Sequence, residues 1–83
     1  MKRIIEVTTP GNGKTYEFLA DSEIKVADAR KALIMEILAF ENGALALDEE
    51  DAILCSKRSE KRLPDNAPLF TGAYGDDFEF LLL

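Results

Sequence analysis

The sequence predicts an α+β fold in which one main helix packs on one face of a mixed sheet of four or five strands. Three observations support this prediction. Apolar and polar residues alternate near both ends of the chain, the period changes to that of a helix in the middle, and the final segment is the most apolar. Eighty-three residues suffice for one hydrophobic core, so we expect a single domain over residues 1–83.

The first two strands are predicted on either side of a glycine-rich turn. Residues 4–8 alternate, with Ile5 and Val7 on the inner face, and residues 14–20 alternate again. Between them, residues 9–13 contain one proline and two glycines, which supply turn geometry and positive φ angles. The pattern therefore predicts a β-hairpin. The inward residues of its second strand are expected to be Tyr16, Phe18 and Ala20.

A helix is predicted over residues 24–42, because apolar residues fall on one arc at about 100° per residue. Asp21 and Ser22 precede it as candidate caps, and Gly43, directly after it, favours a left-handed stop. Arg30 lies on the apolar side, so it must reach solvent or find an acidic or carbonyl partner. The apolar arc comprises Val26, Ala29, Leu33, Ile37 and Phe40, widened by Ile34 and Leu38.

The second half of the chain predicts further strands separated by turns. Residues 52–56 form a short strand, residues 57–62 a charged turn, and Leu63 begins a very short strand. Residues 68–74 predict an irregular turn, and residues 78–83 alternate as the last strand. A strongly apolar last strand is best placed centrally, beside the first strand and under the helix, which is the arrangement of a β-grasp. Its inward residues are expected to be Phe78, Phe80 and Leu82.

These segments resemble ubiquitin and its relatives along nearly the whole chain. Residues 13–18 resemble the Gly-Lys-Thr turn and second strand of ubiquitin. The helix, opening with Val26 and carrying Arg30 on its inner side, resembles ubiquitin's helix with its buried lysine. Residues 69–80 are similar to the leucine-rich loop, turn and last strand of the family. The resemblance implies a ubiquitin-like β-grasp domain that binds proteins through the open face of its sheet.

The end of the chain differs from ubiquitin and from the sulfur carriers ThiS and MoaD. Those proteins close on a flexible Gly-Gly tail, whereas this sequence closes on Leu83 inside a predicted strand, so we expect neither conjugation nor sulfur transfer. A tail-less domain of this length, with a Leu63-Pro64-Asp65 step and a Gly75-Asp76 turn, resembles the EsaB/YukD group. That resemblance implies a non-enzymatic, cytoplasmic accessory component of a bacterial type VII secretion system, with its membrane-associated ATPase as a partner.

Two alternatives to an adaptor remain open from the sequence. The chain could be a self-associating structural domain, which makes a monomer or a weak homodimer the expected states. It could also be a ubiquitin-like modifier or sulfur carrier if the native chain is longer.

The composition argues against an enzyme. There is no histidine and one cysteine, which excludes histidine-based triads, histidine-based zinc sites and an intrachain disulfide. Cys55 has no histidine to activate it, so we expect a small buried hydrophobe rather than a nucleophile. The acidic residues 48–51 and 76–77 favour solvated loops over a cation site, because consecutive carboxylates point in several directions. We expect no catalytic, cofactor-binding or metal-binding residues.

Charge and hydropathy limit the kinds of partner and the location that we expect. A net charge of −6 argues against general affinity for nucleic acid or anionic lipid. Apolar runs such as residues 80–83 are too short to span a bilayer, and Glu6 interrupts the apolar stretch that a signal peptide requires. We therefore expect a cytoplasmic protein with a protein partner and no direct membrane insertion.

The candidate site is an apolar patch on the face of the sheet away from the helix. Alternation places Ile4, Leu81 and Leu54 there, with Leu83 joining them and Leu19 also outward. A shift of one residue in the third strand would exchange the faces of Ile53 and Leu54, so that assignment stays open. Small monomers seldom expose a large apolar patch without a use for it. A basic rim, which steers association, is assigned to Lys57, Arg58, Lys61 and Arg62.

Overall fold

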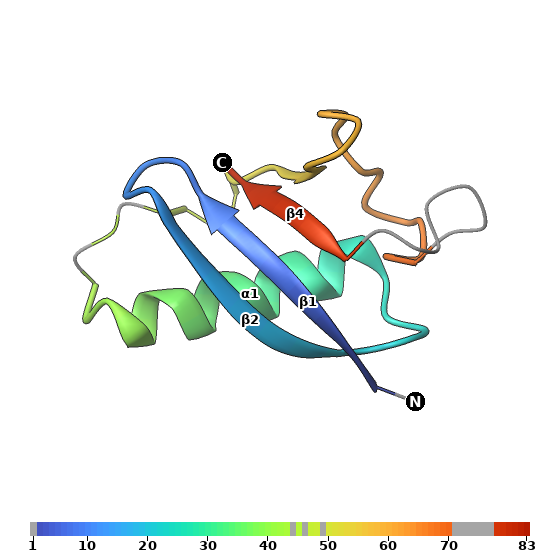
Figure 1. The fold of residues 1–83 in the computed structure, drawn as a ribbon, viewed down its shortest axis with the longest axis horizontal. Helices are drawn as coiled ribbons and strands as arrows, with labels where there is room; N and C mark the ends of the chain where they lie inside the picture. The colour runs from blue at the N-terminus through green and yellow to red at the C-terminus, as the bar shows by residue number, and fades with distance from the viewer. Residues whose placement is uncertain (1, 44, 46, 49, 71–77) are drawn as a thin grey trace.

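One helix packs across one face of a four-stranded sheet in a computed structural model, which describes residues 2–43, 45, 47–48, 50–70 and 78–83 (Figure 1). The sheet order is β2-β1-β4-β3, with β1 and β4 parallel and the other neighbours antiparallel. The last strand thus lies centrally beside the first, which confirms the predicted α+β β-grasp. In chain order the elements are β1 (Lys2–Thr9), β2 (Lys14–Asp21), α1 (Val26–Phe40), β3 (Leu54–Ser56) and β4 (Glu79–Leu82).

The β1–β2 hairpin forms as its alternation predicts. Ile5 and Val7 are buried, and each pairs across the ladder with an inward residue of β2, Phe18 and Tyr16 respectively. In the turn, the amide of Gly13 donates a hydrogen bond of 2.9 Å to the carbonyl of Thr9. Gly13 has a φ of +70°, whereas the φ of Gly11 is outside the positive region. Of these two glycines, Gly13 is therefore the one whose backbone conformation favours glycine.

The helix begins at Val26, and the predicted caps Asp21 and Ser22 are wrong. Lys25 occupies the N-cap position and its side chain makes no capping hydrogen bond. Asp21 instead accepts a hydrogen bond from the amide of Glu23 through its own side chain, 2.9 Å away, which closes a local turn.

The first amides of α1 are satisfied by a distant loop. The amide of Val26 donates to the carbonyl of Ala67 at 2.9 Å, and the amide of Ala27 donates to the carbonyl of Asp65 at 3.0 Å. These bonds replace the side-chain cap that a helix start otherwise requires. The helix stops as predicted, since Asn42 and Gly43 have φ angles of 52° and 75°.

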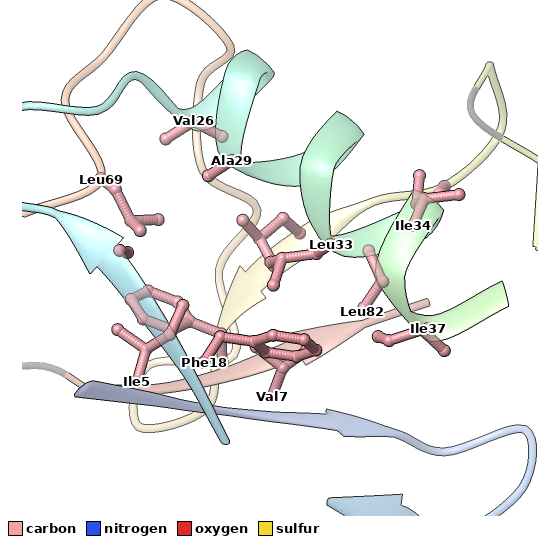
Figure 2. Packing of buried hydrophobic residues seen from close by; sticks show 14 residues of the cluster. Ile5, Val7, Phe18, Val26, Ala29, Leu33, Ile34, Ile37, Leu69 and Leu82 are labelled. Carbon is pink, nitrogen blue, oxygen red and sulfur yellow. The ribbon is translucent and has the colours of Figure 1, made fainter. Parts of the chain in front are cut away.

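The core lies between α1 and the sheet. Figure 2 shows Leu33 and Ile37 of the helix directed towards Phe18 and Leu82 of the strands. Phe40, predicted on the apolar arc, is 68% exposed, because the helix ends there; its ring stacks on Tyr16 at a centroid distance of 6.2 Å. The buried hydrophobic cluster comprises Ile5, Val7, Phe18, Ala20, Val26, Ala29, Leu33, Ile34, Ile37, Ala52, Leu54, Leu69, Phe80 and Leu82.

The second half is less regular than predicted. β3 spans three residues, and the segment predicted to start a further strand at Leu63 makes an isolated bridge instead, in which Arg62 pairs with Cys55. Phe78 is 47% exposed rather than inward, because β4 begins one residue later. The predicted turn at 75–76 lies outside the described residues, as do the last residues of the turn predicted at 68–74.

Candidate protein-binding surface

The face of the sheet away from α1, called the outer face below, does not include Leu54. Leu54 pairs with Leu82 in the β3–β4 ladder, and both side chains are buried in the core, 2% and 1% exposed. The expectation that Leu54 faces outward is therefore wrong. Alternation along the strand places its neighbour Ile53 on the outer face instead, which is the one-residue shift of register considered from the sequence.

Ile4 and Leu81 both belong to the outer face, but they do not form one patch. Leu81 pairs with Thr8 of β1, and Ile4 lies four residues earlier on the same strand, which is about 13 Å at the rise of a β-strand. Ile4 pairs instead with Leu19 of β2, and the two are 59% and 65% exposed. Between Ile4 and Leu81 lies a row of carboxylates, in which Glu6 faces a glutamate on each neighbouring strand.

Three residues form a second apolar region, called the leucine face below: Ile53, Leu81 and Leu83. The amides and carbonyls of Ile53 and Leu83 exchange two hydrogen bonds, of 3.0 and 2.9 Å, which extend the β3–β4 ladder by one pair. Ile53 and Leu81 are partly exposed, and Leu83 is 52% exposed. The sequence predicts Leu81 and Leu83 on the surface but leaves the choice between Ile53 and Leu54 open, because so short a strand shows too little alternation to settle its own register.

Two of the four predicted basic residues, Lys57 and Arg62, lie on the outer face beside the leucine face. Arg62 forms an isolated bridge with Cys55, and Cys55 pairs with Leu81, so the three lie in one row across the sheet. Lys57 follows β3 two residues after Cys55, and its amide donates to the carbonyl of Glu79 at 3.1 Å. Lys61 lies one residue from Arg62 on the alternate side, and Arg58 is exposed at the turn. Lys57 and Arg62 thus border the leucine face.

Cys55 is a small buried hydrophobe, as its surroundings in the sequence predict. It is 6% exposed, and burial raises the pKa of its thiol, while the nearby charge of Arg62 acts in the opposite direction. A thiol with a raised pKa is a poor nucleophile at neutral pH. Cys55 therefore contributes packing to β3 rather than chemistry.

Arg30 finds both kinds of partner that its place on the helix requires. One terminal nitrogen, Nη1, donates to the carbonyl of Ala52 at 3.1 Å, and Nη2 lies 3.4 Å from Oδ2 of Asp65. Its Nε is buried without a hydrogen-bond partner. These contacts hold the segment before β3, at Ala52, and the loop at Asp65 against the helix, so Arg30 has a structural role.

The acidic run forms a turn in its described part. Asp48 accepts a hydrogen bond from the amide of Glu50 through its side chain, and its carbonyl accepts one from Ala52. Within the described ranges, no group of three histidine, cysteine, aspartate or glutamate side chains is arranged to hold a metal ion. The second acidic pair, at 76–77, lies outside those ranges.

Comparisons with known proteins agree with the fold. No family model matches the sequence, and no curated protein matches it. Among solved structures, the ubiquitin-like domain of Plasmodium falciparum Dsk2 is similar, with a TM-score of 0.71 and 20% sequence identity over 99% of this chain and 96% of that chain. At this identity the likeness shows a shared fold, the ubiquitin-like β-grasp. In the part of the chain that the structure describes, no helix is both long and apolar enough to cross a membrane.

Proposed function

We propose that this chain is a non-enzymatic protein-binding module that docks through the leucine face. The observation that supports the proposal is that Leu83 is 52% exposed and that Leu81 and Ile53 beside it are partly exposed on the outer face of the sheet. Apolar centres with a polar rim are typical of protein interfaces. Ubiquitin-like domains as a class bind protein partners, which agrees with this use of the surface.

The chemistry of the partner follows from the rim. Lys57 and Arg62 border the leucine face, so the partner should present apolar side chains surrounded by carboxylates. Such rim charges change the association rate and its salt dependence more than the affinity. A row of carboxylates separates Ile4 from Leu81, so Ile4 lies outside the proposed surface.

The test is affinity capture from cells that express the protein naturally, with three baits. The Leu81→Glu variant places a charge at the centre of the leucine face. The Met35→Glu variant is the matched control, because Met35 is an exposed apolar residue on the helix, 67% exposed. A defined partner held by wild type and Met35→Glu and lost by Leu81→Glu supports the proposal. A partner that Leu81→Glu retains, with the variant's circular dichroism unchanged, refutes this surface.

A finer proposal follows from the resemblance to the EsaB/YukD group. If the chain shares the role of that group, it is a cytoplasmic accessory component of a bacterial type VII secretion system, and its partner is a membrane-associated secretion ATPase. The purified cytoplasmic part of such an ATPase should bind wild type and not Leu81→Glu. Absence of binding to wild type removes the secretion assignment and leaves the module itself in place.

The self-associating alternative uses the same surface. Pairing of two leucine faces would give a dimer whose light scattering rises with concentration in wild type and not in Leu81→Glu. The modifier alternative is tested by the intact mass of the protein from its native cells, which would show a conjugate or an extension.

A further inference from the structure

Asparagine followed by glycine occurs twice in this chain, as Asn12-Gly13 in the hairpin turn and as Asn42-Gly43 directly after α1. Asparagine is a thermolabile residue. In such a pair the backbone nitrogen of the glycine can attack the side-chain carbonyl carbon (Cγ) of the asparagine, because glycine has no Cβ to hinder the approach. The two pairs have different surroundings in the structure, and these surroundings decide which pair reacts.

The side chain of Asn12 is held in place by three hydrogen bonds. Its Oδ1 accepts one from the hydroxyl of Thr9 and one from the amide of Lys14 at 3.1 Å, and its Nδ2 donates to the hydroxyl oxygen of Tyr16 at 3.1 Å. The attacking group is held as well, because the amide of Gly13 donates to the carbonyl of Thr9 at 2.9 Å. The turn joins two strands of eight residues each, so both reacting atoms belong to a firmly anchored segment.

The side chain of Asn42 lacks this support. It is exposed, and within the described part of the chain its amide group makes no hydrogen bond. Its backbone has a φ of 52°, in the left-handed region that costs an ordinary residue energy and that glycine adopts freely. The side chain of Asn42 can therefore turn towards the next backbone nitrogen whenever the backbone at this position opens.

Two backbone hydrogen bonds close the helix at this position. The amide of Gly43 donates to the carbonyl of Leu38 at 2.9 Å, and the amide of Asn42 donates to the carbonyl of Ala39 at 3.3 Å, which together form a Schellman motif. While the motif is closed, the nitrogen of Gly43 is engaged and does not attack. The second bond is longer than a typical N–H···O bond, and hydrogen bonds at helix ends open at a small cost in free energy. Opening of the motif therefore controls the reaction at Asn42.

We infer that Asn42 is a site of spontaneous deamidation in the folded protein, whereas the contacts of Asn12 protect it. In the open state the nitrogen of Gly43 forms a bond to Cγ of Asn42, and the side-chain nitrogen leaves as ammonia, which carries away the proton of the Gly43 amide. The product is a cyclic imide. Water then breaks either C–N bond within the ring: cleavage at Cγ gives aspartate, and cleavage at the backbone carbonyl carbon gives isoaspartate. One water is consumed and one ammonia released, so the step needs no oxidant and no enzyme.

Either product alters the end of the helix. Both carry a new carboxylate beside the C-terminal end of α1, where the helix dipole disfavours negative charge. Isoaspartate also adds one carbon to the backbone before Gly43, which moves the amide of Gly43 out of register with the carbonyl of Leu38. The new charge lies next to Glu41, which accepts a hydrogen bond from the hydroxyl of Tyr16 and joins the helix to β2. We therefore expect the modified helix end to open more often, with faster hydrogen exchange of the Gly43 amide.

The test is to incubate the purified folded chain at mildly alkaline pH and to follow both asparagines by peptide mass spectrometry. Deamidation is detected as the mass gain of replacing an NH₂ group by OH, and isoaspartate by methyl labelling with protein L-isoaspartyl methyltransferase. We expect both products at residue 42. We expect a rate at Asn12 that is lower by about tenfold or more, which corresponds to a difference of at least about 1.4 kcal/mol in the free energy of opening. In concentrated urea the two asparagines should react at similar rates, because the contacts that distinguish them are lost.

Two variants test the contacts one at a time. Asn42→Gly removes the reactive side chain, and glycine suits the left-handed conformation at the end of a helix, so this variant should remain folded and give no methyl labelling at residue 42. Thr9→Val removes the hydroxyl that donates to Oδ1 of Asn12 and keeps the branched shape of a side chain that is 1% exposed. It should raise the rate at Asn12 and leave the rate at Asn42 unchanged.

Three results would overturn the inference. The first is equal rates at the two asparagines in the folded protein, and the second is an unchanged Asn42 in folded protein whose urea-treated sample reacts at both positions. The third is a contrast between the two rates that persists in urea, since it would assign the difference to the flanking sequence rather than to the structure. The measurement needs no binding partner, so its outcome is independent of the leucine face, which Leu81→Glu tests separately.

Discussion

The hydroxyl of Tyr16 donates a hydrogen bond to Oε1 of Glu41 over 2.8 Å, which joins β2 to the end of the helix. Lys14 supports the same carboxylate, with Nζ lying 3.0 Å from each of its oxygens. Asn12 in the hairpin turn donates to the Tyr16 oxygen at 3.1 Å. The hairpin and helix are thus connected by polar contacts at one end, in addition to the core between them.

This connection predicts a pH-dependent stability. The hydrogen bond from Lys14, followed by that from Tyr16, lowers the pKa of Glu41 below its ordinary value of 4.5. The unfolded chain therefore binds this proton at higher pH than the folded protein does, and the contribution to stability is complete above pH 4.5. It disappears as the pH falls through the lowered pKa of the folded state.

Glu41→Gln measures that contribution. Urea unfolding at a series of pH values should show wild type more stable near neutral pH, with the difference shrinking below pH 4.5. At the alkaline end, the contact raises the pKa of Lys14 above 10.5, so the advantage should also fade as the pH rises through that raised value. A difference that stays constant from neutral to acidic pH would show that the carboxylate does not titrate in this contact.

Leu54 and Leu83 should respond differently to truncation. Leu54→Ala removes a core side chain that is 2% exposed, so it should lower the free energy of unfolding by about 2–5 kcal/mol. Leu83→Ala removes a side chain that is 52% exposed and should change it by less than about 0.5 kcal/mol. Equal losses in urea unfolding would place the two leucines in equivalent environments, contrary to the β3–β4 register.

The sequence predicts the hairpin and the helix well because each has a long periodic pattern. β1 and β2 span eight residues each, and both keep a period of two along their length. The central place of β4 also follows from the sequence, because residues 80–83 are too apolar for an edge. Those elements carry their own pattern, so no distant contact is needed to predict them.

The errors fall where a distant contact decides the outcome. β3 has three residues, and its register is set by pairing with Leu82 and by Arg62 on its other side rather than by its own alternation. The start of α1 is set by the carbonyls of Asp65 and Ala67, which lie more than forty residues along the chain from the predicted caps, so local capping rules do not include them.

The two glycines of the hairpin turn should differ on replacement by alanine. Gly13 has a φ of +70°, so Gly13→Ala should cost about 1–2 kcal/mol although its new Cβ would meet open space. Gly11 carries no such constraint, and its new Cβ would make an ordinary contact of 3.7 Å with Leu45. Gly11→Ala should therefore be neutral or stabilise by about 0.4–1 kcal/mol. Thermal unfolding of both variants checks the contrast, and similar losses in the two would contradict it.

Arg30 should stabilise the fold more through its hydrogen bond to the carbonyl of Ala52 than through its ion pair with Asp65. Arg30→Met keeps an unbranched apolar stem but leaves the carbonyl of buried Ala52 without its donor, so it should cost about 1–3 kcal/mol. Asp65→Asn weakens the ion pair alone, and because that carboxylate is 46% exposed it should cost less than about 1 kcal/mol. Urea unfolding distinguishes the two roles: a loss in Asp65→Asn as large as that in Arg30→Met would assign the effect to the ion pair. A smaller loss in Asp65→Asn than in Arg30→Met would show that Arg30 acts as the hydrogen-bond donor that holds the segment before β3 against the helix.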